Sequence, residues 1–112
     1  MKMRLKYGVF MRMFLISDNI DTKTGMRLAG VDGVIVHERQ HIVDAFKSAV
    51  KDQSIGIILI TEFLAEQVPD LIRDQKLNFS KPLIIEIPDR HGTKRPPDYI
   101  MRYVNEAIGL KL

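Results

Sequence analysis

One short motif in the sequence has the spacing of a zinc site. The residues His37-Glu38-Arg39-Gln40-His41 match H-E-x-x-H, the pattern in which two histidines bind zinc and the glutamate acts as a general base. This chemistry requires both histidines on one continuous helix, a third ligand and an open coordination position. His37 directly follows the apolar run at residues 34–36, so we expect it at the end of a strand, away from the helical face of His41. The candidate third ligands are His91, Glu62 and Glu66, and because the spacing selects none of them we interpret the motif as a chance match.

A second stretch has the composition of a phosphate-binding loop. Thr22-Lys23-Thr24-Gly25 follows the first apolar run and is similar to the phosphate loop of flavodoxins, where backbone N–H groups bind phosphate at a helix N-terminus. Asp18 and Asp21 place negative charge where the anion would bind, and the chain has no tryptophan to stack on a flavin. These features favour a structural interpretation, in which a threonine caps a short helix and Gly25 forms the turn that opens it.

Other catalytic signatures are missing from the sequence. A phosphoacceptor domain of the receiver type needs an aspartate at the end of the third strand, but the third apolar run ends with Ile60-Thr61. The chain contains no cysteine nucleophile, no G-x-x-x-x-G-K-[ST] nucleotide loop and no Gly-x-Ser-x-Gly elbow. We therefore expect a protein that is not an enzyme by itself and has no cofactor or metal site.

The positive charge of the chain is concentrated at its beginning. The 112 residues, enough for one domain, include 17 Lys and Arg against 14 Asp and Glu. Four of the basic residues, Lys2, Arg4, Lys6 and Arg12, fall in the first twelve positions, which contain no acid. The remaining hundred positions carry 13 basic and 14 acidic residues, so the domain itself does not have the charge of a nucleic-acid-binding protein.

The first sixteen residues are basic and apolar, as in a signal peptide. Arg12 interrupts the apolar run, and no small-x-small cleavage site follows before Ser17. No stretch approaches the ~18 apolar residues of a membrane span, so we expect a cytoplasmic protein. Residues 1–10 form an N-terminal extension if Met11 or Met13 is the natural start; the alternative is a basic arm that contacts anionic lipid or nucleic acid.

The hydrophobic pattern predicts alternating strands and helices. Four runs rich in Ile, Val and Leu indicate strands buried on both faces of a sheet, at residues 13–16, 34–36, 57–60 and Leu83–Ile87. Helical spacing is found from Met26, from Ile42 to Val50, and from Leu64 to Ile72, where Pro69 is expected to kink or break the helix. This order predicts a three-layer α/β/α domain with a four-stranded parallel sheet, of the flavodoxin/CheY-like class, over residues 11–88.

The end of the chain has a different composition. Residues 89–97 contain two prolines, a glycine and four potentially cationic side chains, which is typical of a linker. Residues 98–112 predict a C-terminal helix, because apolar pairs such as Tyr99/Ile100 and Tyr103/Val104 recur every four residues. This apolar stripe packs either on the protein's own sheet or, as a tethered helix, on a partner, and the sequence does not choose between the two.

Four motifs in the same order resemble one known family. Met13-Phe14-Leu15-Ile16-Ser17-Asp18 is similar to the opening of the F subunit of the V-type (A/V-type) ATPases, and Thr24-Gly25-Met26-Arg27-Leu28-Ala29-Gly30-Val31 to its T-G-F-R-L-A-G-[IV] signature. Ile55-Gly56-Ile57-Ile58-Leu59-Ile60-Thr61-Glu62 and Ile85-Glu86-Ile87-Pro88 resemble two further family motifs. The resemblance covers residues 11–112. The chain departs from the family pattern in three places: Asp89-Arg90 stands where the family has Ser-Lys, Pro69 lies inside a helix that is usually continuous, and residues 1–10 are additional.

The resemblance implies a non-catalytic rotor subunit in the central stalk of an ATPase that transports protons or sodium ions. It implies binding to the coiled coil of the D subunit, and a mobile C-terminal helix that reaches the catalytic head of A and B subunits and modulates ATP hydrolysis. We expect the contacts in the loops at the carboxyl ends of the strands and in the segment Ile87–Arg95; the candidate partner-binding residues are Arg90, His91, Lys94, Arg95, Tyr99 and Tyr103. The alternative is a small flavodoxin-like module that binds a ligand or metal through the threonine-rich loop or the zinc motif.

Overall fold

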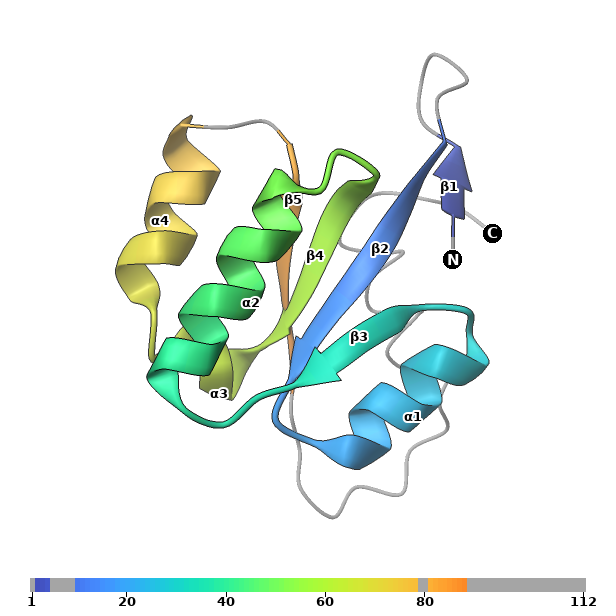
Figure 1. Cartoon of the computed structure of the whole chain (residues 1–112), viewed down its shortest axis with the longest axis horizontal. Coiled ribbons are helices and arrows are strands. Elements are labelled where there is room, and N and C mark those ends of the chain that lie inside the picture. The colour runs from blue at the N-terminus through green and yellow to red at the C-terminus, as the bar shows by residue number, and fades with distance from the viewer. Residues whose placement is uncertain (1, 5–9, 79–80, 89–112) are drawn as a thin grey trace.

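The computed structural model describes residues 2–4, 10–78 and 81–88 and consists of a twisted sheet with helices on both faces (Figure 1). In chain order the elements are β1 (Lys2–Arg4), β2 (Phe10–Ser17), α1 (Ile20–Leu28), β3 (Asp32–Ile35), α2 (Arg39–Lys51), β4 (Ile55–Thr61), α3 (Glu62–Ala65), α4 (Pro69–Asn78) and β5 (Leu83–Ile87). The four predicted strands correspond to β2, β3, β4 and β5, which confirms the predicted α/β fold class.

The four predicted strands pair in parallel to make one sheet. β2 lies between β3 and β4, with Ile16 opposite Val34 on one side and opposite Ile60 on the other, and β5 pairs with the free side of β4. The sheet order is therefore β3, β2, β4, β5. β1 is a fifth strand that the sequence pattern did not predict; it runs antiparallel to the first half of β2, on the same side as β3.

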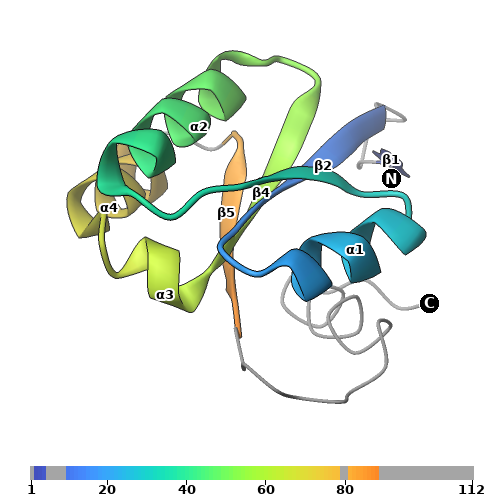
Figure 2. The same ribbon diagram turned by 60° about the horizontal axis from the view of Figure 1, so that its bottom comes forward.

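Each face of the sheet has its own hydrophobic core. Alternation along the strands sends Ile16, Ile58 and Ile60 to one face and Leu15 and Leu59 to the other, and all five side chains are fully buried. The first face is covered by α2, α3 and α4, whose apolar residues join this cluster, and α1 lies against the second face (Figure 2). The strands are near-continuous apolar runs because helices cover both of their faces.

The helix after β2 begins earlier than the sequence predicts. α1 starts at Ile20, and Asn19 is its N-cap, with Oδ1 accepting hydrogen bonds from the backbone amides of Asp21 (2.8 Å) and Thr22 (3.2 Å). The whole segment Thr22-Lys23-Thr24-Gly25 therefore lies inside the helix. The prediction of a threonine cap and an opening turn glycine is wrong, and so is the phosphate-loop alternative, because that loop would require a non-helical backbone before the helix.

The proline in the third predicted helix separates two helices. α3 ends at Ala65, and Pro69 is the first residue of α4, a position where its missing N–H removes no intrahelical hydrogen bond. The predicted break is confirmed. α2 spans the predicted amphipathic helix and buries Ile42, Phe46 and Ala49.

Candidate interaction surface at the strand ends

The four parallel strands end at the same edge of the sheet, where proteins of this architecture commonly bind their ligands (Figure 1). The side chains of Ser17 and Thr61, at the ends of β2 and β4, are fully buried there. Thr61 Oγ1 donates to Asp18 Oδ1 at 3.2 Å, and Ser17 Oγ accepts from the Asn19 amide at 2.9 Å. These polar groups are thus paired with the protein's own loop, which they hold against the end of β4.

The strand ends also lack the arrangement of a receiver domain. The third parallel strand along the chain, β4, ends at Thr61, as the sequence predicts, and a threonine cannot take the role of the acceptor aspartate. Asp18 follows the first parallel strand, but Asp21 is already in the first turn of α1. Within the residues that the structure describes, no three His, Cys, Asp or Glu side chains are placed to hold a metal ion.

The two histidines of the H-E-x-x-H motif are not in one helix. Glu38 is the N-cap of α2, with an extended backbone (φ −91°, ψ 146°), so His37 precedes the helix and only His41 belongs to it. This confirms the predicted position of His37 and removes the shared helical face that a zinc ligand pair needs. Both histidines are exposed. Of the candidate third ligands, Glu62 and Glu66 are exposed on or beside α3, and His91 lies outside the described residues.

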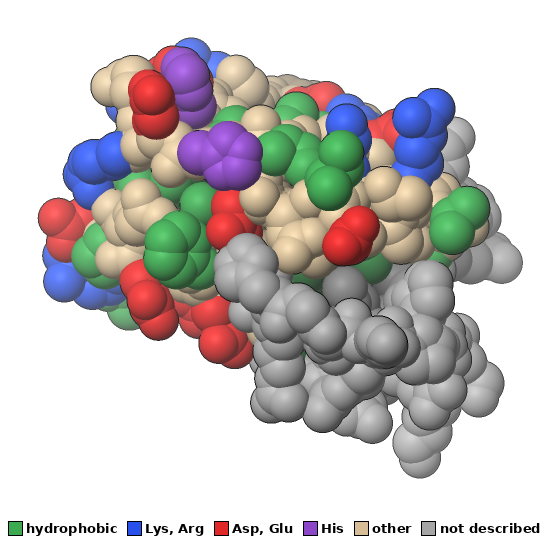
Figure 3. All heavy atoms as spheres, turned by 90° about the horizontal axis from the view of Figure 1, so that it is seen from below, with side chains coloured by type: hydrophobic (Ala, Val, Ile, Leu, Met, Phe, Trp, Pro, Cys, Tyr) green, Lys and Arg blue, Asp and Glu red, His purple; other side chains and the backbone are tan. Residues whose placement is uncertain are grey.

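Two large apolar side chains are exposed at this edge. Ile20, the first residue of α1, is 70% exposed, and Phe63, in the first turn of α3, is 54% exposed. On this face of the molecule, apolar side chains lie among acidic side chains, basic side chains and the two histidines (Figure 3). Neither Ile20 nor Phe63 was predicted as a binding residue from the sequence, although their positions just after two apolar strands were a usable signal.

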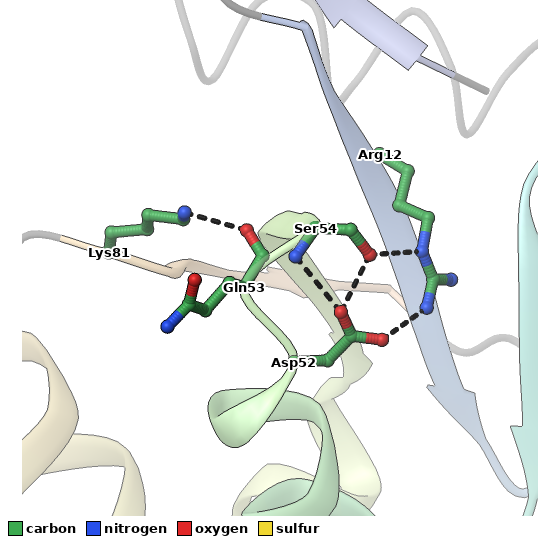
Figure 4. A network of polar contacts seen from close by, with 5 residues as sticks. All are labelled: Arg12, Asp52, Gln53, Ser54 and Lys81. Carbon is green, nitrogen blue, oxygen red and sulfur yellow. Dashed lines mark hydrogen bonds and ion pairs between the residues drawn. The ribbon is translucent and has the colours of Figure 1, made fainter.

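The opposite edge of the sheet carries a polar network that joins three segments (Figure 4). Arg12 of β2 donates to Asp52 Oδ2 at 2.6 Å and to Ser54 Oγ at 2.8 Å. The hydroxyl and the backbone amide of Ser54, together with Arg12, hold the pKa of Asp52 below its usual value. Lys81 donates to the Gln53 carbonyl at 2.7 Å, which ties the segment before β5 to the same loop. Because these groups form hydrogen bonds with one another, we assign the network a role in stabilising the fold.

The six candidate partner-binding residues all lie outside the described part of the chain: Arg90, His91, Lys94, Arg95, Tyr99 and Tyr103. The same is true of the predicted linker (89–97) and C-terminal helix (98–112). Their assignment to partner binding therefore stays a prediction from the sequence. Among the described residues, no helix is long and apolar enough to cross a membrane.

Comparison with known proteins identifies the family. The profile of the ATP synthase (F/14-kDa) subunit family matches residues 13–104. The chain belongs to this family. The resemblance to the F subunit of the A/V-type ATPases is thereby confirmed, and the protein is a subunit of a rotary ATP synthase complex.

Relatives in this family match over nearly their full length. The F subunit of the A-type ATP synthase of Thermococcus kodakarensis is 35% identical over 107 residues, covering 91% of this chain and 98% of its own. The protein of the same name from Methanocaldococcus jannaschii is 32% identical over 103 residues, with coverage of 91% and 99%. The crystal structure of the F subunit of the V-type ATP synthase from Archaeoglobus fulgidus has a TM-score of 0.55 at 21% identity, covering 69% of this chain and 96% of its own; this likeness supports the fold alone.

The family signature that begins at Thr24 has a structural explanation in α1. Gly30 has a φ of 84°, its amide donates to the Arg27 carbonyl, and the Val31 amide donates to the Met26 carbonyl, both at 2.9 Å. This is a Schellman motif, which satisfies the last carbonyls of a helix and needs glycine at the left-handed position. Met26 and Val31 are both buried in the second core, so the signature encodes how α1 ends and packs on the sheet.

Proposed function

We propose that this protein is a non-catalytic rotor subunit that binds the coiled coil of the D subunit in the central stalk of a rotary ATPase. Membership of the ATP synthase (F/14-kDa) subunit family supports a place in the complex. The non-catalytic role is supported above all by the hydrogen bonds at the strand ends, which join Thr61 to Asp18 and Ser17 to Asn19. The edge that binds substrates and cofactors in related folds is here closed by the protein's own hydrogen bonds, with exposed apolar side chains beside it.

We further propose that the C-terminal helix, residues 98–112, contacts the catalytic head of A and B subunits and modulates ATP hydrolysis during proton or sodium ion transport. The sequence supports this role through the regular apolar stripe that includes Tyr99 and Tyr103, and through the basic, proline-containing tether before it. In this proposal the protein is cytoplasmic and peripheral to the membrane, held there by the rest of the complex.

Co-expression with a D-type coiled-coil subunit tests the first part of the proposal. Size-exclusion chromatography should show a stable 1:1 complex, because a subunit that transmits torque needs a permanent interface. Charge reversal of the tether, as Arg90→Glu with Lys94→Glu, should weaken this complex, whereas Lys47→Glu, at an exposed position on α2, should leave it intact. A wild-type chain that elutes apart from the coiled coil would refute the rotor assignment.

ATP hydrolysis by the reconstituted complex tests the second part. Replacing Tyr99 and Tyr103 by serine should change the hydrolysis rate without releasing the subunit, because the stripe is assigned to the head and not to the coiled coil. An unchanged rate with the subunit still bound would contradict the regulatory role.

A further inference from the structure

The loops that follow β2, β3 and β4 form one continuous surface, which we call the strand-end surface and define as residues 18–21, 37–38 and 62–66. Two contacts tie these segments together. Thr61 Oγ1 donates to Asp18 Oδ1, which links the end of β4 to the loop after β2. The Arg39 guanidinium donates to the Gln67 carbonyl, which links the start of α2 to the end of α3. The three loops therefore hold a fixed arrangement.

The apolar centre of the strand-end surface consists of Ile20 and Phe63. Each lies two residues beyond a partner of the Asp18–Thr61 hydrogen bond, so both residues belong to the same edge of the sheet. Phe63 exposes 54% of its surface although its neighbours Leu64 and Ala65 are buried in the core. An aromatic side chain that is anchored on a packed helix and left half in water is well suited to fill a pocket or groove of a partner.

Acidic side chains predominate around this centre. The three segments contain five carboxylates, from Asp18, Asp21, Glu38, Glu62 and Glu66, and the exposed cation Arg39 directly follows Glu38. The side chains of Asp21, Glu38, Glu62 and Glu66 are exposed and form no ion pair with another residue that the structure describes. Such a concentration of one charge is unfavourable by itself and complementary to a basic partner.

Another exposed apolar side chain lacks this setting. Leu77 of α4, 74% exposed, is directly preceded by Lys76, and Arg73 and Asp74 lie one turn away, with Arg73 paired to Asp70. A scattered leucine among mixed charges is ordinary for a protein surface. The strand-end surface differs because an exposed aromatic side chain coincides with an excess of carboxylates over cations.

We infer that the strand-end surface docks an amphipathic helix that presents apolar side chains between lysines or arginines. Resting on the function proposed above, this helix belongs to the coiled-coil partner in the stalk. The partner's apolar side chains cover Phe63 and Ile20, and its cations pair with the carboxylates at the rim, of which Glu38 and Glu66 lie beside the Arg39–Gln67 contact.

The experiment measures the dissociation constant of the purified full-length protein with a D-type coiled-coil subunit by isothermal titration calorimetry, at about 50 mM and about 300 mM sodium chloride. Phe63→Ser should weaken binding by about tenfold or more, and Phe63→Leu by much less. The double variant Glu38→Lys with Glu66→Lys should weaken binding to a similar extent at low salt and flatten the salt dependence. The matched controls Leu77→Ser and Asp74→Lys, on α4, should bind within about twofold of wild type, and circular dichroism melts confirm the fold of each variant.

The outcomes separate the two proposals. Wild-type protein that fails to bind overturns the proposed rotor function, whatever the variants do. Wild-type protein that binds, with the Phe63 and charge-reversal variants unchanged, overturns the strand-end docking surface and leaves the rotor function standing. An unchanged or tighter complex after charge reversal would indicate a different occupant, such as the chain's own basic tether, and would also overturn the inference.

Discussion

The glycine that ends α1 offers a direct test of how the family signature works. Gly30 has a φ of 84°, a left-handed conformation in which an L-residue with a side chain is strained by about 1–2 kcal/mol. Its amide and that of Val31 satisfy the carbonyls of Arg27 and Met26, so the backbone cannot relax to negative φ without losing two hydrogen bonds. Gly30→Ala is therefore expected to lower the free energy of unfolding by about 1–2 kcal/mol, and the melting temperature by at least about 4 °C.

Two matched variants isolate the conformational cause. Gly25 lies inside the same helix, so Gly25→Ala should stabilise the protein, by up to about 1 kcal/mol, through helix propensity. Gly30→Asn should lose less stability than Gly30→Ala, because asparagine tolerates left-handed backbone. Urea unfolding followed by circular dichroism measures all three variants. A Gly30→Ala protein as stable as wild type would refute the argument, since it would mean that the helix ends equally well without a left-handed residue.

Three further substitutions test the packing, capping and electrostatics of the domain. A Cβ atom at Gly33 would lie 2.6 Å from Leu15 Cβ, so Gly33→Ala should destabilise the protein by about 1–3 kcal/mol in urea unfolding, and a loss below about 0.5 kcal/mol would contradict this overlap. Asn19→Ala removes the N-cap of α1 and should lower the free energy of unfolding by about 1 kcal/mol; an unchanged urea midpoint would show that the cap is dispensable. Hydrogen bonds from Ser54 and Arg12 lower the pKa of Asp52. The charged Asp52 carboxylate therefore stabilises the fold fully above the usual pKa of 3.8, and this stabilisation is lost as the pH falls through the lowered pKa. Melts from neutral to acidic pH should show Asp52→Asn less stable than wild type at neutral pH, with the difference shrinking below about pH 4; a difference that grew there would contradict the sign.

The strands were predictable from the sequence because their burial is local information. Each parallel strand is covered by helices on both faces, so its sequence is a continuous apolar run whichever strands pair with it. The bounds of the strand Leu83–Ile87 were predicted to the residue. β1 carries no such signal: three residues, two of them basic, become a strand only through pairing with β2. The start of α1 was missed for a related reason, because threonines, glycine and aspartate are weak helix formers and the cap of Asn19 and the core contact of Met26 decide the helix.

The sequence predicted contacts at the carboxyl ends of the strands, but not which residues form the strand-end surface, because the topology of the sheet brings them together. The hundred positions after the basic start carry nearly balanced charge, which indicated a domain close to neutrality. The parallel order β3, β2, β4 brings three acidic loops, separated by up to about forty residues, to the same edge, where carboxylates outnumber cations. A net charge near zero is therefore compatible with an uneven distribution of charge over the surface. Phe63 can be recognised as a candidate binding residue only when the carboxylates of the other two loops are placed near it. In the proposed docking on a coiled coil of the stalk, such an asymmetry supplies both the attraction and the orientation that a uniform surface would lack.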